Sequence, residues 1–309
     1  MPLFFSRRAY NAQTKKFTNN RSTVTRYVAL EGQSPGSGGW KGSIIGQADW
    51  LQKVRASGAA HGVLIFVHGF NTSQAEMLRR MDKIEKGLRI EGFQGAVVAF
   101  DWPSDGSVLN YGSDRTDAKH VAPFLVHDAL VPIMKMSGKP KTSILAHSMG
   151  AFLTLRAFSD VGDSVVSGSG AWKLDQVCFA SADADAAWLE KGAWGALILK
   201  HRSRRFTNYY NGRDRVLKLS GGLINGGRKR LGRIGMPQLV TARQFDVYCN
   251  EQYLRDVPDN EQTMRYSHTW WFDNSGFYND LNRTLRGDDA QAMPTRKATN
   301  KPPDQALLT

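Results

Sequence analysis

Short runs of apolar, β-branched residues alternate with amphipathic stretches along most of this chain. The clearest run lies within residues 61–70 (HGVLIFVHGF), and its unbroken Val-Leu-Ile-Phe-Val segment is typical of a strand buried on both faces of a parallel sheet. A helix should follow it, because Ser73 and Glu76 have the spacing of a capping box and apolar residues then recur at helical intervals. Further strands are expected at residues 22–30, 95–100, 142–145, 176–182, 205–211 and 244–249. The pattern predicts an α/β fold with a mostly parallel, doubly wound sheet and helices on both faces.

The same pattern suggests how the chain divides. One catalytic domain is expected over residues 41–290, preceded by a basic N-terminal arm and an early strand in residues 1–40 and followed by a flexible tail in residues 291–309. Residues 1–20 are polar and basic enough to form a loose arm, and residues 32–39 form a Gly/Ser/Pro loop. Only one helix separates the strands at 176–182 and 205–211, so no large cap domain fits there. Residues 216–242 are therefore the candidate partial lid.

Composition narrows the class of protein. The chain has 309 residues, of which 41% are hydrophobic and 22% charged, as in an ordinary globular enzyme. It has no run of 18 apolar residues, and its first residues lack the apolar core of a secretory signal, so a cytoplasmic location is expected. Its two cysteines, Cys178 and Cys249, fall in expected strands, which favours buried, reduced thiols over a disulfide framework.

The net charge of +13 is unevenly distributed. Basic residues gather in residues 1–30 and 200–233, which favours anionic partners, although a solvated basic face is the simpler interpretation. No nucleic-acid motif accompanies them, so no specific nucleic-acid partner is expected. We expect Arg228, Lys229, Arg230 and Arg233 to lie on the catalytic face, where they would favour anionic acyl groups or anionic lipid surfaces.

Residues 141–152 (KTSILAHSMGAF) contain the strongest candidate chemistry. An apolar strand run leads into a stretch that can continue as a helix, and Ser148 stands at the sharp turn between them. Ala146 and Gly150 are small, which such a turn needs because the strand and helix backbones approach closely. This is the pattern of a nucleophile elbow, with Ala146 in place of the usual first glycine.

A serine hydroxyl becomes nucleophilic when an imidazole accepts its proton and a carboxylate holds that imidazole. Asp214 follows a predicted strand, and His268 follows the last one, so Ser148, Asp214 and His268 have the chain order Ser, acid, His. Asp183 and Asp185, after the preceding strand, are the rival acids. Polar residues at the carboxyl ends of parallel strands should gather at one edge of the sheet.

The segment His68-Gly69-Phe70 reads as an oxyanion loop, in which the backbone N–H groups of Phe70 and Met149 would stabilise the tetrahedral oxyanion. His68 is then architectural. The substrate pocket is expected to include Asn71, Trp102, His147 and Trp270, although the tryptophans at 270 and 271 fit a core role equally well.

The ordered motifs FVHGFNTS, FDWPSDGSVLNYGSDR, LAHSMG, NGRDRVLKLS and SHTWWF resemble those of a bacterial α/β-hydrolase family of uncharacterised function, over residues 60–286. The resemblance implies an esterase- or lipase-like serine hydrolase with Ser148, Asp214 and His268 as its triad.

The expected activity is that of a serine carboxylester hydrolase acting on small or medium esters, with no metal or organic cofactor. Two alternatives stay open. One is a lipase or phospholipase that works at anionic lipid surfaces, and the other is a non-catalytic binding module on a hydrolase fold.

Overall fold

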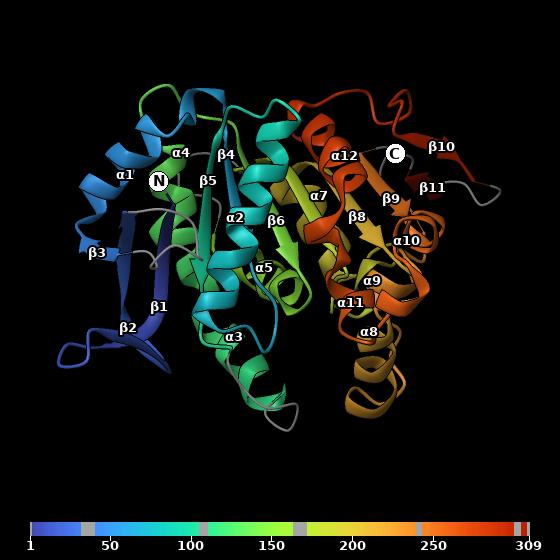
Figure 1. The fold of residues 1–309 in the computed structure, drawn as a ribbon, viewed down its shortest axis with the longest axis horizontal. Helices are drawn as coiled ribbons and strands as arrows, with labels where there is room; N and C mark the ends of the chain where they lie inside the picture. The colour runs from blue at the N-terminus through green and yellow to red at the C-terminus, as the bar shows by residue number, and fades with distance from the viewer. Residues whose placement is uncertain are drawn as a thin grey trace.

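The computed structural model describes residues 2–31, 41–104, 111–162, 172–238, 243–299 and 304–307. Its strands form one sheet in the order β10-β11-β9-β8-β7-β6-β4-β5-β1-β2-β3 (Figure 1). Neighbouring strands from β11 to β1 are parallel, and β10, β2 and β3 add antiparallel edges. The predicted, mostly parallel sheet is confirmed. The strands are β1 (Leu3–Asn11), β2 (Lys16–Glu31), β3 (Lys41–Ile45), β4 (Val63–Val67), β5 (Ala96–Asp101), β6 (Thr142–His147), β7 (Leu174–Ala180), β8 (Ser203–Tyr210), β9 (Gln244–Tyr248), β10 (Arg296–Ala298) and β11 (Asp304–Leu307).

Helices cover both faces of the sheet, as predicted. Apolar residues of α1, α3 and α5 pack on one face, and those of α2, α10 and α12 pack on the other. On the second face α2 and α12 lie side by side (Figure 1). The helices are α1 (Gln47–Ala56), α2 (Gln74–Ile90), α3 (Tyr111–Leu125), α4 (Val131–Met134), α5 (Met149–Ser159), α7 (Trp194–Arg202), α8 (Arg215–Leu219), α9 (Leu231–Ile234), α10 (Asn250–Asp256), α11 (Tyr266–Thr269) and α12 (Ser275–Arg286). Short 3₁₀ or π-helical turns occupy Ala59–His61, Val126–Leu130, Ala186–Leu189, Ser220–Ile224, Asp259–Glu261 and Trp270–Asp273.

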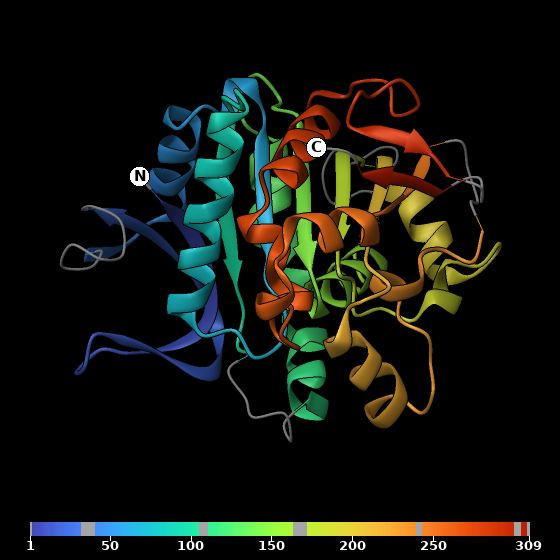
Figure 2. The same ribbon diagram turned by 45° about the vertical axis from the view of Figure 1, so that its right-hand side comes forward.

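The N-terminal segment is not a loose arm. Strand β1 pairs with β5 through residues Leu3 to Ser6, and it forms an antiparallel hairpin with β2 that extends from the edge of the sheet (Figure 2). Arg7 and Arg8 are only 4% and 2% exposed, and the Arg7 guanidinium lies 3.5 Å from the centre of the Phe124 ring. The prediction of a loose arm was wrong, because it rested on the basic composition of this segment and these arginines have partners inside the fold. The expected loop at residues 32–39 lies outside the described residues.

The C-terminal segment likewise contains ordered strands where a flexible tail was expected. Strand β11 adds to β9 in parallel, and β10 pairs with β11. Arg296 is buried, and its Nη2 lies 2.6 Å from Oδ1 of Asp280 in α12. The buried ion pair ties this segment to the second face of the sheet.

Within the described ranges, no helix combines the length and the apolar character needed to cross a membrane. Cys178 and Cys249 are buried and do not form a disulfide. Burial raises the pKa of Cys178 to about 12, so both structure and chemistry favour the expected reduced thiols.

Helix α3 and the α8 segment both project beyond the carboxyl ends of the central strands (Figures 1 and 2). Arg115 of α3 donates to the Asn225 side chain over 3.2 Å, which connects the two projections. These elements therefore flank the edge of the sheet at the carboxyl ends of the strands, which is where ligands bind in open α/β sheets.

Candidate active site

Ser148 occupies a strained turn between β6 and α5. Its φ of 56° and ψ of −126° are unusual for a residue with a side chain. The turn is held by backbone hydrogen bonds, since Ser148 N–H donates to the Ala180 carbonyl and the Ser148 carbonyl accepts from Ala151 and Asp183. The predicted strand–turn–helix geometry is therefore present, with Ser148 at its apex.

The close approach of backbones at this turn explains its small residues. A Cβ on Gly150 would lie 2.4 Å from the Val67 carbonyl oxygen and 2.6 Å from that of His68. A Cβ on Gly69 would lie 2.6 Å from the Ser148 Cβ and 3.2 Å from its Oγ. The loop after β4, which includes Phe70, therefore lies directly against the Ser148 side chain.

His268 and Asp214 meet although 54 residues separate them. The His268 Nδ1 lies 2.7 Å from Oδ2 of Asp214, and both side chains are buried. Because the carboxylate accepts a hydrogen bond from Nδ1–H, the Nε2 atom of a neutral His268 is left as a proton acceptor. Asp214 also caps α8, since its Oδ1 accepts from the Leu217 N–H over 2.9 Å. The cap fixes the orientation of the carboxylate.

Asp183 has different partners. Its carboxylate accepts from Tyr111 over 2.8 Å and from Ser220 over 2.9 Å, and Nε of Arg230 lies 3.3 Å away. Arg230 is itself 2% exposed, so these two residues form a buried ion pair. Asp185 instead accepts from the Ala187 N–H. Of the candidate acids, Asp214 is the one that contacts His268.

His147 contacts both the backbone and the ring of His268. Its Nε2 lies 2.9 Å from the backbone carbonyl oxygen of His268, and the two ring centres are 4.6 Å apart. Burial is the main cause that lowers the pKa of His147 well below its ordinary value, so its ring is neutral. Its Nε2–H therefore donates to the His268 carbonyl.

Ser148 and His268 line a cavity of about 540 Å³. Of the residues predicted to form the pocket or the oxyanion loop, Phe70 and Asn71 line this cavity. The side chains of Trp102, His147, Met149 and Trp270 do not, because each is at most 2% exposed. Trp102 stacks on His68, and Trp270 packs on Tyr253 and Trp271, so the pocket assignments of Trp102, His147 and Trp270 were wrong. The remaining lining residues are Ser73, Glu76, Arg79, Arg80, Tyr111, Asp183, Val216, Leu219, Ser220, Ile224, Met264, Arg265 and Thr269.

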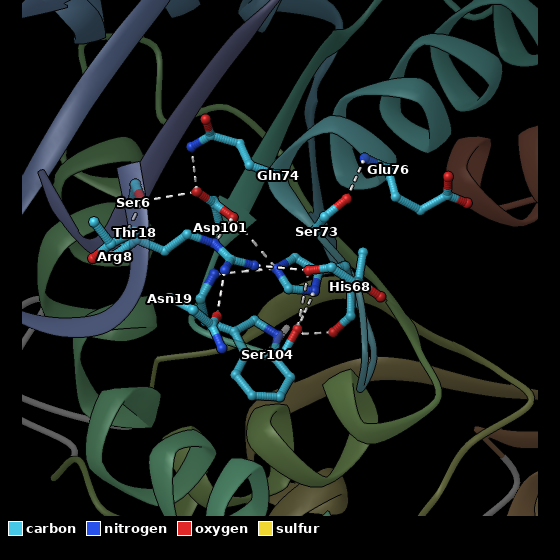
Figure 3. Close-up of polar contacts among 12 residues, drawn as sticks. Ser6, Arg8, Thr18, Asn19, His68, Ser73, Gln74, Glu76, Asp101 and Ser104 are labelled. Carbon is cyan, nitrogen blue, oxygen red and sulfur yellow. Dashed lines mark hydrogen bonds and ion pairs between the residues drawn. The ribbon is translucent and has the colours of Figure 1, made fainter. Parts of the chain in front are cut away.

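A buried network holds the loop that follows β4 (Figure 3). The Asp101 carboxylate accepts from Ser6 over 2.8 Å, from Arg8 over 2.7 Å and from Gln74 over 2.8 Å. Arg8 also donates to the Thr72 carbonyl over 2.8 Å. Burial alone would raise the pKa of Asp101, but the charge of Arg8 and the other polar partners of the carboxylate together outweigh burial and hold this pKa well below the usual range.

His68 has the architectural role expected of it. Its Nδ1 lies 3.0 Å from the Gly69 carbonyl oxygen, and its Nε2 accepts from the Trp102 N–H over 3.1 Å. Burial lowers the pKa of His68, which keeps the ring neutral and compatible with both bonds.

The basic cluster expected on the catalytic face does not line the cavity. Arg230 is buried against Asp183, and Nη1 of the exposed Arg228 lies 3.6 Å from Asp185. Arginines from two other segments, Arg79 and Arg80 of α2 and Arg265 before α11, line it instead. These arginines were not among the predicted site residues, although their positions after the oxyanion loop and just before His268 were a usable signal.

No group of three or more His, Cys, Asp or Glu side chains is placed to hold a metal ion in the part of the chain that the structure describes.

Residues 46–248 match the family described as "Alpha/beta hydrolase of unknown function (DUF900)", and the chain belongs to that family. An uncharacterized protein of Nostoc sp. (strain PCC 7120) is 45% identical over 60 residues, which cover 19% of this chain and 15% of that relative. The match therefore spans only a small part of the relative's length.

A solved structure, an extracellular α/β-hydrolase from a Paenibacillus species, is also similar. It is described as sharing structural and functional homology with tobacco salicylic acid binding protein 2. The alignment has 12% identity and a TM-score of 0.25, and it covers 61% of this chain and 77% of the other.

Proposed function

We propose that this protein is a serine hydrolase that cleaves small or medium carboxylic esters through an acyl-enzyme. The observation that carries the proposal is the convergence of Ser148 and His268 on one cavity, with His268 bonded at Nδ1 to the buried Asp214. A cavity of about 540 Å³ suits a small organic molecule.

In the proposed reaction, the Ser148 Oγ attacks the ester carbonyl carbon while the His268 Nε2 takes the hydroxyl proton. The negative charge of Asp214 stabilises the imidazolium that forms, and the backbone N–H groups of Phe70 and Met149 stabilise the oxyanion. The bond to the leaving alcohol then breaks, and His268 gives that alcohol the proton. Water attacks the acyl-enzyme by the same route, which releases the acid and restores Ser148.

The proposal is tested by hydrolysis of p-nitrophenyl esters from acetate to palmitate. We expect short and medium chains to be cleaved, and Ser148→Ala to lower kcat by a factor of about 10⁴ or more. Ser159→Ala, which changes an exposed serine at the end of α5, is the matched control and should behave as wild type. Labelling by a fluorophosphonate should likewise require Ser148.

Other outcomes would change the conclusion. A preference for palmitate would favour a lipase. Ester cleavage that survives in Ser148→Ala would remove this serine as the nucleophile. No cleavage of any ester, together with no fluorophosphonate labelling of the wild type, would favour the binding-module alternative.

A further inference from the structure

Three arginines surround one carboxylate in the cavity that contains Ser148. Glu76 lies 2.7 Å from Nη2 of Arg79, 3.1 Å from Nε of Arg80 and 3.6 Å from Nη2 of Arg265. We call these four residues the Glu76 cluster. All four line the cavity, and together they carry a net charge of +2.

This charge is not cancelled by the other ionised groups at the cavity. Asp183 also lines it, but the buried Arg230 neutralises that carboxylate, and Tyr111 and Ser220 occupy its oxygens. Asp214 faces His268 and does not line the cavity. The Glu76 cluster therefore determines the sign of the potential that a substrate meets.

The cluster is placed by the elements that also carry the catalytic groups. Arg79 and Arg80 lie in α2, which begins directly after the loop that lies against Ser148, and Arg265 stands three positions before His268. The Arg80 side chain is 8% exposed, whereas those of Arg79 and Arg265 are 58% and 76% exposed. Arg80 is thus held in place, while the other two can turn toward a bound molecule.

A different part of the lining is apolar. Val216, Leu219 and Ile224, from α8 and the turn after it, contribute aliphatic side chains, and Met264 adds another. Ile224 and Met264 remain 40% and 43% exposed, so apolar surface is left open around the cavity. The lining of the cavity therefore combines cationic side chains with an apolar wall formed by these four residues.

We propose that the Glu76 cluster makes this site selective for esters that carry a carboxylate elsewhere in the molecule. Guanidinium groups bind carboxylates with a matching, two-pronged geometry, and a net positive cluster attracts them before contact. The apolar wall accommodates the uncharged part of the same substrate. This inference rests on the proposed ester hydrolysis and adds the substrate class to it.

The kinetic test compares two p-nitrophenyl esters of similar size, the anionic hemisuccinate and the neutral butyrate. In the wild type we expect kcat/KM to be about tenfold higher for the hemisuccinate, and this preference to fall as salt is added. The double variant R79Q/R265Q should lower the ratio of the two kcat/KM values about fivefold, because each exposed charge contributes modestly. R89Q is the control, since Arg89 is also on α2 but does not line the cavity.

A binding test decides the inference even if ester hydrolysis is absent. Monomethyl adipate and its neutral analogue dimethyl adipate would be titrated into Ser148→Ala by calorimetry. We expect tighter binding of the monomethyl ester, with a preference that R79Q/R265Q reduces and R89Q retains. Equal binding of both compounds, or an unchanged preference in R79Q/R265Q, would overturn the inference. Absence of hydrolysis and of fluorophosphonate labelling in the wild type would instead overturn the proposed function.

Discussion

The acid of the proposed triad can be identified by comparing two conservative changes, Asp214→Asn and Asp183→Asn. In Asp214→Asn the side-chain oxygen can still accept from the Leu217 N–H at the start of α8, so the helix keeps its cap. The charge beside His268 is lost, and the amide no longer holds the required tautomer. A comparable change in a serine protease lowers kcat about 10⁴-fold, which corresponds to about 5 kcal/mol of transition-state stabilisation.

Asp183→Asn should act on stability instead. It leaves the guanidinium of Arg230, a residue that is 2% exposed, without its carboxylate. Removing one partner of a buried ion pair costs about 3–5 kcal/mol, which lowers Tm by roughly 5–8 °C in a chain of this size. The folded variant should keep kcat within about tenfold of wild type, because Asp183 does not contact His268.

The assay pairs kcat for p-nitrophenyl butyrate, measured well below Tm, with thermal unfolding followed by circular dichroism. We expect Asp214→Asn to lose activity with a Tm close to wild type. Asp183→Asn should keep most of its activity and unfold at a lower Tm. If Asp214→Asn kept more than a tenth of the wild-type kcat while Asp183→Asn lost the activity, Asp183 would be the acid and the reasoning would be refuted.

Two further predictions concern the surroundings of the site. Gly150→Ala should lower both Tm and kcat, because its Cβ would lie 2.4 Å from the Val67 carbonyl oxygen and overpacking costs about 1–3 kcal/mol. The control is Gly112→Ala in α3, where a Cβ meets nothing within 4 Å, and it should leave Tm unchanged or slightly higher. Asp101 has a lowered pKa, so its contribution to stability is fully present above its unfolded pKa of about 4 and declines by about 1.4 kcal/mol per pH unit as pH falls below that value. Urea unfolding at pH 5, 4 and 3 should therefore show a shallower pH dependence for Asp101→Asn, and parallel curves would contradict the assignment.

Local patterns predicted the framework of the fold. The strands β4 to β9 and the helices between them follow from apolar runs and helical spacing, and the Ser73 cap of α2 follows from the capping box. The turn at Ser148 was predictable for the same reason, because a sharp strand-to-helix turn requires small residues within two positions of the serine. These features depend on neighbours in the chain.

Apart from β2, part of which was expected at residues 22–30, the strands at the two sides of the sheet were not predicted from local patterns. In β1 the basic pair Arg7 and Arg8 follows only a very short apolar run, which resembles a solvated arm, yet pairing with β5 and burial of Arg8 against Asp101 make this segment part of the sheet. Such partners lie more than ninety residues away, as the separation of 93 between Arg8 and Asp101 shows. Charge along the chain does not reveal which cations are buried.

What the sequence alone determined is the class of fold, the strained serine turn and the order of serine, acid and histidine. Tertiary structure decided which carboxylate contacts His268, which aromatics stay in the core, and which arginines face the cavity. The physical reason is the range of the interactions. Secondary structure and turns arise from residues a few positions apart, whereas ion pairs and cavity linings arise where α2, α8 and α11 converge from distant parts of the chain.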